Sequence, residues 1–329
     1  MNKIALAIHG GAGTILKSEM TAELEREYRN GLENSLKKGF NVLQKNGSAL
    51  DAVEIAVSEL ENFPLFNAGR GAVFTHEGKN ELDAAIMDGT TQKAGAVAFV
   101  KNVVNPIKLA RLVMEKTEHI LLGGDGANEF AREMNVEFAP DDYFYTEHRY
   151  RQLLKAREEG VVQLDHTAKT GKRQKAKGKN EESNRKSQIA NRKSLGTVGA
   201  VACDSSGNLA AATSTGGMTN KKFGRIGDTP IIGAGTYADN ETCAVSCTGH
   251  GEFFMQTLAA YDVSARMKYK KLSLEEATNE VIENLRKIGG EGGLIAVDAL
   301  GNVAVPFNSD GMYRGFMTAD GEISVEIYR

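Results

Sequence analysis

The sequence predicts an α+β fold in which mostly antiparallel sheets carry helices on their outer faces. Three observations support this prediction. Short apolar runs occur in pairs joined by turns, as in β-hairpins. Segments with helical periodicity are grouped between these hairpins rather than alternating with single strands, as a doubly wound parallel sheet would require. Glycine is abundant, with 36 residues against five prolines, which suits a fold with many tight turns.

The composition is that of an ordinary globular chain, with 41% hydrophobic and 25% charged residues among 329. No apolar run approaches the roughly 20 residues that cross a bilayer, and the N-terminal run is too short for a secretory signal. The cysteines Cys203, Cys243 and Cys247 lie in apolar runs and are expected to be reduced core residues. We therefore expect a cytoplasmic protein that makes no membrane contact.

In the N-terminal half, a buried strand over 3–8 is expected to run into a glycine turn at 9–13. A helix follows from Thr21, because apolar residues recur every three to four positions. A second helix begins at the N-cap Ser48. The remaining elements expected before residue 160 are strands at 72–74, 82–87 and 94–100 and helices at 106–116, 127–135 and 147–158.

In the C-terminal half, the runs 197–203 and 209–214 predict a hairpin. A late helix at 273–288 carries the capping pair Ser273 and Glu276 and stops at two glycines. The other expected elements are a helix at 251–267 and strands at 231–235, 242–247, 294–297, 303–305, 312–316 and 323–328.

A basic segment separates the two halves. Residues 168–194 contain ten Lys or Arg and two Glu, although the whole chain has a net charge of −3. With few apolar residues the segment predicts a disordered linker. Its charge would also permit nucleic-acid binding through phosphate contacts. Because the segment contains no aromatic residue to stack on bases, a tether is the favoured interpretation and nucleic acid is not an expected partner.

Several common catalytic patterns are missing from the sequence. There is no G-x-S-x-G, no dinucleotide fingerprint, no Walker A loop and no histidine or cysteine pair at metal-ligand spacing. The histidines are therefore expected to be surface residues or hydrogen-bonded core residues. No catalytic cofactor is expected.

Thr197 lies where the linker meets a buried strand, directly after Gly196. A strand-starting threonine is the ordinary interpretation. The alternative is that its hydroxyl attacks the Gly196 carbonyl, because glycine permits strained backbone conformations. Hydrolysis of the resulting ester would free an α-amine with a pKa of about 7.7–8.0, able to act as the base for its own hydroxyl. One residue would then supply both nucleophile and base.

Ordered sequence blocks support that alternative, since together they resemble the N-terminal-nucleophile (Ntn) hydrolases of the plant-type L-asparaginase/isoaspartyl peptidase family. The blocks are 9–13, 64–69, 81–84, 87–89, 196–201, 212–218, 224–228, 233–235 and 246–251. The resemblance implies an αββα four-layer sandwich and autocatalytic cleavage between Gly196 and Thr197. The products 1–196 and 197–329 would form one structural domain and assemble as an (αβ)₂ heterotetramer.

The resemblance also implies roles for individual residues. Thr197 would be the nucleophile, Thr215 would hydrogen-bond near it, and Thr248 and Gly249 would face the oxyanion. Substrate would contact Arg225, Ile226, Gly227, Asp228, Thr248, Gly249, His250 and Gly251, with Asn67 in a supporting position. Arg225 would grip a carboxylate with two hydrogen bonds and Asp228 would take an ammonium. Their spacing alone would equally suit a surface ion pair worth under about 1 kcal/mol.

The activity implied is hydrolysis of the side-chain amide of L-asparagine and of β-aspartyl dipeptides. Both substrates carry the same α-ammonium and α-carboxylate, so the sequence does not indicate which one is preferred. A glycosylasparaginase-like amidase of the same fold and a nucleic-acid-binding protein that uses the basic linker remain the alternatives. The resemblance further implies a structural sodium ion on main-chain carbonyls, those of Leu60, Glu61, Phe63, Phe66, Ala68 and Arg70.

Overall fold

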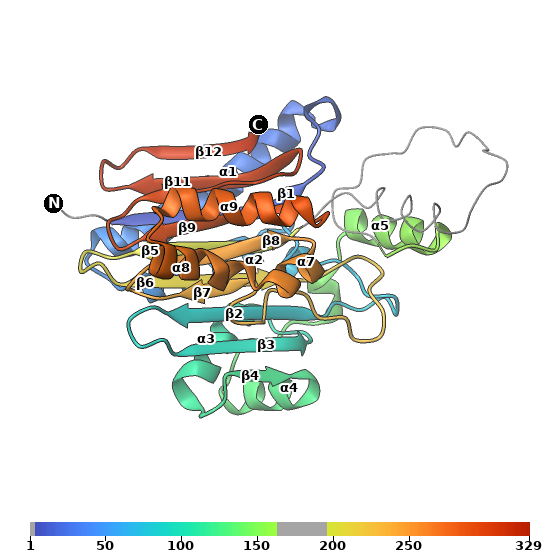
Figure 1. Ribbon diagram of the computed structural model, residues 1–329. Helices are drawn as coiled ribbons and strands as arrows, with labels where there is room; N and C mark the ends of the chain where they lie inside the picture. The colour runs from blue at the N-terminus through green and yellow to red at the C-terminus, as the bar shows by residue number, and fades with distance from the viewer. Residues whose placement is uncertain (1–3, 163–195) are drawn as a thin grey trace.

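The computed structural model describes residues 4–162 and 196–329 (Figure 1). The basic segment predicted to be a disordered linker, 168–194, lies outside the described residues. Among the helices that are described, none combines the length and the apolar character that a membrane span needs.

The larger of two sheets has eight strands in the order β12-β11-β1-β5-β6-β2-β3-β4. All neighbouring strands pair antiparallel except β3 and β4, which are parallel. The strands are β1 (Ala5–Gly13), β2 (Leu82–Asp88), β3 (Ala94–Val100), β4 (Leu121–Gly123), β5 (Val198–Cys203), β6 (Leu209–Thr215), β11 (Gly311–Thr318) and β12 (Ile323–Tyr328).

The smaller sheet has four antiparallel strands in the order β10-β9-β8-β7. They are β7 (Thr236–Ala238), β8 (Cys243–Gly249), β9 (Gly292–Asp298) and β10 (Val303–Ala304). This sheet packs face to face on the centre of the larger one. Their shared core includes Val201 and Ala211 from the larger sheet and Ile295 and Val297 from the smaller.

Helices cover both outer faces, so the layers run helix, sheet, sheet, helix (Figure 1). Alternate residues of a strand point to opposite faces. In β1, Leu6 and Ile8 pack toward the helices while Ala5 and Ala7 pack toward the second sheet. The predicted α+β, αββα sandwich is confirmed. Helices α1 (Ala22–Gln44), α2 (Ala49–Asn62) and α3 (Pro106–Lys116) cover the larger sheet, and α8 (Ala259–Lys270) and α9 (Leu274–Lys287) cover the smaller.

The N-cap residues predicted for three helices are confirmed. The hydroxyls of Thr21 and Ser48 accept hydrogen bonds from Leu24 N and Asp51 N. Ser273 and Glu276 form a reciprocal capping box at α9. The shorter helices are α4 (Gly124–Glu133), α5 (Glu147–Glu158), α7 (Gly251–Thr257) and the 3₁₀ turns η1 (Lys17–Glu19), η2 (Gly69–Gly71) and η3 (Asp141–Phe144).

Four predicted elements were wrong. The glycine run 9–13 is not a turn but continues β1, with a bulge between His9 and Gly11 that re-aims the strand. Residues 72–74 follow a 3₁₀ turn and pair with no strand among the described residues. Residues 231–235 form turns, and only the bridge Ile232–Thr236 leads into β7.

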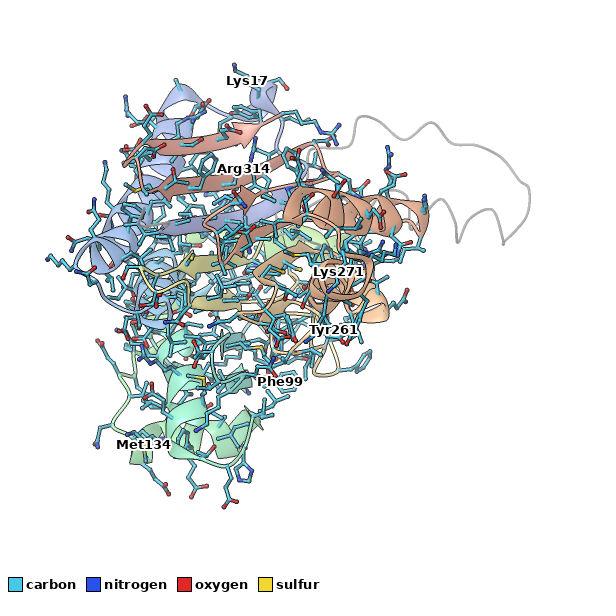
Figure 2. The ribbon with its side chains drawn as sticks, turned by 60° about the vertical axis from the view of Figure 1, so that its left-hand side comes forward. Lys17, Phe99, Met134, Tyr261, Lys271 and Arg314 are labelled. Atoms are coloured by element: carbon cyan, nitrogen blue, oxygen red, sulfur yellow. The ribbon has the colours of Figure 1, made fainter. Side chains whose placement is uncertain are left out.

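The fourth error is the single helix at 251–267. It is two helices, α7 and α8, because Leu258 adopts a left-handed conformation with φ of +48° between them. Hydrophobic periodicity cannot detect a break at one residue. The second helix carries Tyr261 and is followed by the C-cap Lys271, which is also left-handed; both residues are labelled in Figure 2. Strand β4 was not predicted, because three residues are too few to show a pattern.

Candidate active site

A small pocket lies where strand ends from both sheets meet. Thr197 directly precedes β5, Thr215 ends β6 and Gly249 ends β8. Antiparallel pairing places the start of β5 beside the end of β6, with Val198 opposite Ser214. The pocket is lined by Gly196, Thr197, Thr215, Gly217, Met218, Arg225, Gly227, Asp228, Thr229 and Gly249. Most of the residues expected from the sequence therefore come together.

Thr215 contacts both sides of the Gly196–Thr197 peptide bond. The Thr197 hydroxyl donates to the Thr215 hydroxyl oxygen at 3.1 Å. The Thr215 hydroxyl in turn donates to the Gly196 carbonyl at 3.2 Å and accepts from the Gly217 amide at 3.0 Å. The nucleophile and the carbonyl that it was predicted to attack are thus held on one side chain.

Asn67 supplies a second donor to the same carbonyl. Its Nδ2 donates to the carbonyl oxygens of Gly196 at 2.7 Å and Gly217 at 2.8 Å. Its Oδ1 accepts from the Val73 amide at 3.0 Å. Three hydrogen bonds fix this fully buried side chain, so the Gly196 carbonyl is polarised by two fixed donors, Asn67 and Thr215.

His9 is a site residue that the sequence reasoning missed. It is fully buried in β1, and its Nδ1 donates to the Thr197 carbonyl at 3.0 Å, since a carbonyl can only accept. Burial lowers the His9 pKa to about 3, against the weaker effect of this hydrogen bond. The neutral ring therefore accepts at Nε2 from the Ser246 hydroxyl, 2.9 Å away. The only sequence signal was a histidine directly before the glycine run.

Behind His9, a chain of buried hydroxyls connects the two sheets. Ser246 on β8 lies 2.7 Å from the hydroxyl of Thr213 on β6. The Thr236 hydroxyl on β7 donates to Thr213 at 2.7 Å. The backbone of Thr197 is therefore positioned through His9 by contacts that reach into the second sheet.

Arg225 and Asp228 line the pocket but are not paired with each other. Nε and Nη2 of Arg225 donate to Oε1 and Oε2 of Glu252, each at 3.0 Å. Oδ2 of Asp228 is buried and has no hydrogen-bond partner among the described residues. Burial raises the Asp228 pKa to about 7, although the Arg225 charge opposes the shift. Ile226 and Gly227 form the link between these two side chains.

Gly251 borders the space between the two charges. A Cβ at this position would lie 2.7 Å from Oδ1 of Asp228 and 2.9 Å from Nη2 of Arg225. A side chain there would fill the gap between the guanidinium and the carboxylate. The glycine therefore leaves room for a small group that contacts both.

The two residues expected at the oxyanion lie at the end of β8. Thr248 is fully buried, and its hydroxyl oxygen accepts from the Ala12 amide at 3.4 Å. Gly249 lines the pocket, and a Cβ there would lie 2.1 Å from the ring of Phe254. His250 is not among the residues that line the pocket; its Nε2 is 3.3 Å from Oε2 of Glu252.

The carbonyls expected to bind sodium lie in residues 60–70, from the last turn of α2 through the turn η2. This segment includes Glu61, which the sequence reasoning considered only for its carbonyl. The buried Glu61 carboxyl accepts from the Ser214 hydroxyl at 2.7 Å and the Ile107 amide at 3.0 Å. Burial raises its pKa to about 8. Within 4–162 and 196–329, no cluster of three or more His, Cys, Asp or Glu could hold a metal ion.

Comparisons with known proteins show the family to which the chain belongs. The family model described as asparaginase matches residues 2–327. The isoaspartyl peptidases of Salmonella typhimurium and Escherichia coli are 51% and 50% identical to the chain, covering 100% of it and 100% and 97% of their own lengths. The isoaspartyl peptidase/L-asparaginase of Xenopus laevis is 41% identical, over 99% of this chain and 96% of its own. The chain therefore belongs to the asparaginase family of amide hydrolases.

Proposed function

We propose that the protein hydrolyses the side-chain amide of L-asparagine and of β-aspartyl dipeptides, with Thr197 as an N-terminal nucleophile. All three relatives named above are called isoaspartyl peptidases, and the one from Xenopus laevis is also called an L-asparaginase. The observation that carries the proposal is the pairing of the Thr197 hydroxyl and the Gly196 carbonyl on Thr215. This arrangement suits cleavage of the bond between the two residues.

Cleavage begins with attack of the Thr197 hydroxyl oxygen on the Gly196 carbonyl carbon. Negative charge then develops on the Gly196 oxygen, where Asn67 and Thr215 already donate hydrogen bonds. The peptide C–N bond breaks and the nitrogen takes the hydroxyl proton, which leaves an ester. Water hydrolyses the ester, giving the Gly196 carboxylate and a Thr197 with a free α-amine and a free hydroxyl.

The mature Thr197 then acts on substrate. Its α-amine accepts the hydroxyl proton as the oxygen attacks the side-chain carbonyl of the substrate. Ammonia or an amino acid leaves with that proton, and water releases L-aspartate from the ester. In this proposal Arg225 binds the α-carboxylate, Asp228 binds the α-ammonium, and Thr248 and Gly249 stabilise the oxyanion. No cofactor is needed for these steps.

Four finer features remain part of the proposal. We propose that 1–196 and 197–329 form one structural domain and associate as an (αβ)₂ heterotetramer, and that the protein is cytoplasmic. We also propose a structural sodium ion on the carbonyls of loop 60–70. Carbonyl oxygens suit a hard cation. Gly69 packs against the Glu61 carbonyl, since a Cβ would be 2.6 Å from its oxygen, so the segment folds back onto the end of α2.

The experiment that tests the proposal compares the wild type with Thr197→Ala. We expect purified wild type to give two bands on a denaturing gel, the smaller beginning at Thr197, and to hydrolyse β-Asp-Leu. Thr197→Ala should stay as one band and be inactive, whereas the surface control Thr318→Ala should behave as the wild type. An intact and active wild-type chain would overturn the proposal.

The two alternatives are tested with the same preparations. Faster hydrolysis of a glycosylated asparagine than of β-Asp-Leu would favour the glycosylasparaginase-like amidase. A salt-sensitive complex with RNA would favour the nucleic-acid-binding protein. None of the three relatives named above has either activity in its name.

A further inference from the structure

Glu252 binds Arg225 of the pocket and has no role in the proposed chemistry. It lies in the first turn of α7 and binds Arg225 with two parallel hydrogen bonds, from Nε to Oε1 and from Nη2 to Oε2. A two-pronged pair of this kind fixes the plane and the direction of a guanidinium. Glu252 therefore decides where Arg225 points.

The pairing uses only one side of the guanidinium. The other side of the guanidinium, which carries Nη1, makes no hydrogen bond to the described residues. Two glycines border it. A Cβ at Gly227 would lie 2.7 Å from Nη1, and one at Gly251 would lie 2.9 Å from Nη2. The end of the guanidinium that Glu252 does not bind thus packs against the two glycines at the lining of the pocket.

The same pairing explains why Asp228 lacks a partner. Arg225 is near enough to act on the Asp228 charge, yet Oδ2 of Asp228 is buried without a hydrogen bond from the described residues. An unpaired buried acceptor is costly, so a guanidinium that was free to turn would bind it. A direct Arg225–Asp228 pair would close the space beside Gly251.

We propose that Glu252 is a positioning residue that holds Arg225 away from Asp228 and so keeps both charges available to a substrate that carries an α-carboxylate and an α-ammonium. The inference rests on the proposed function, since it concerns the same zwitterion. Without Glu252, Arg225 turns onto Asp228, and the two charges neutralise each other before the substrate arrives.

Binding of L-aspartate to the cleaved protein tests this without turnover. We expect Glu252→Gln to weaken the affinity about 10-fold or more in calorimetry, because the neutral amide cannot form the two-pronged ion pair. Glu252→Asp keeps the charge but is too short to reach both nitrogens, so its affinity should lie between the two. Glu283→Gln, which removes the partner of Arg286 on the surface, is the matched control and should bind as the wild type.

The pH dependence gives a readout that a loss of general stability would not produce. Arg225 and Glu252 act on Asp228, and Arg225 and His250 act on Glu252. The other titratable neighbours are the buried Cys247, which faces Asp228, and the buried Asp83, which interacts with Arg225. When Arg225 turns onto Asp228, the carboxylate is favoured. The pH below which aspartate affinity falls should therefore move downward in Glu252→Gln.

The outcomes separate the two proposals. Unchanged or tighter aspartate binding by Glu252→Gln, with the wild type binding normally, would overturn the positioning role alone, since it would mean that Glu252 is passive or competes with the substrate. A cleaved wild type that does not bind L-aspartate would overturn the proposed function, and the inference with it. The unfolding temperature of each variant checks that it is folded.

Discussion

At the scale of single residues, the position of Thr197 depends on a glycine in the neighbouring strand pair. Gly199 lies opposite His9 in the pairing of β1 with β5. A Cβ there would lie 2.0 Å from the Ser246 hydroxyl oxygen and 2.5 Å from Nε2 of His9. The hydrogen bond that fixes the His9 ring therefore occupies the space that any larger residue would need.

Replacing Gly199 by alanine should consequently destabilise the fold. We expect a loss of about 1–3 kcal/mol, the usual cost of overpacking a core, because neither β1 nor β8 can easily move. Thermal unfolding measures the effect. Gly126→Ala is the control, since a Cβ at that helical position has nothing within 4 Å and alanine favours helix. Equal unfolding temperatures for the two variants would contradict the prediction.

Replacing Asn67 should slow the cleavage of the chain. Asn67→Ala leaves the Gly196 carbonyl with Thr215 as its remaining side-chain donor among the described residues. Loss of one donor to a developing oxyanion typically slows a reaction about 10²–10³-fold. We therefore expect cleavage to slow by that order, followed as the rate at which the two fragments appear on a gel. Asn302→Ala, which removes a hydrogen bond in the distant turn at Asp298, should cleave at the normal rate.

At the scale of helices and strands, the sequence predicted best where a local pattern repeats. The helices 106–116 and 147–158 and the strand 323–328 have the predicted bounds. The failures depend on contacts that are distant in sequence. His9 hydrogen-bonds to Thr197, which is 188 residues later in the sequence. The glycines after His9 remain in a strand because β11 pairs with them. The role of Glu252 was also hidden, since its partner Arg225 is 27 residues earlier.

The same limit applies to the carboxyl group at the end of α2. Sequence alone shows Glu61 as one more charged helical residue, but folding buries it against Ser214 and raises its pKa from 4.5 to about 8. A carboxyl group whose pKa rises on folding stabilises the folded state below its unfolded pKa. That contribution is lost as the pH rises through the folded pKa.

The free energy of unfolding should therefore fall between pH 6.5 and 8, by about 2 kcal/mol from Glu61 alone. His9 has a folded pKa of about 3 and an ordinary value of 6.5. It therefore changes the free energy of unfolding little in this pH range. We expect Glu61→Gln to show a smaller fall than the wild type in denaturant titrations at the two pH values. An identical fall in both proteins would show that Glu61 ionises without cost.

At the scale of the whole molecule, the proposed cleavage site divides the chain but not the sheet. Strands β1, β2, β3 and β4 come from 1–196, and β5, β6, β11 and β12 from 197–329. In the eight-stranded sheet the two sets interleave, because β1 lies between β11 and β5, and β6 pairs with β2. The first set thus pairs along three borders with the second.

This interleaving predicts that the cleaved fragments cannot separate without unfolding. Wild type that has been fully cleaved should elute from a sizing column as one species under native conditions and yield two bands only in denaturant. Its unfolding should also be one cooperative transition seen by both fragments, because neither can keep its half of the sheet when the central strands are lost. Fragment 197–329 expressed alone should fail to fold, as β5 would lack β1 and both sheets would lose part of their shared core. Elution of two separate folded species after cleavage would contradict this view of the molecule as one structural unit.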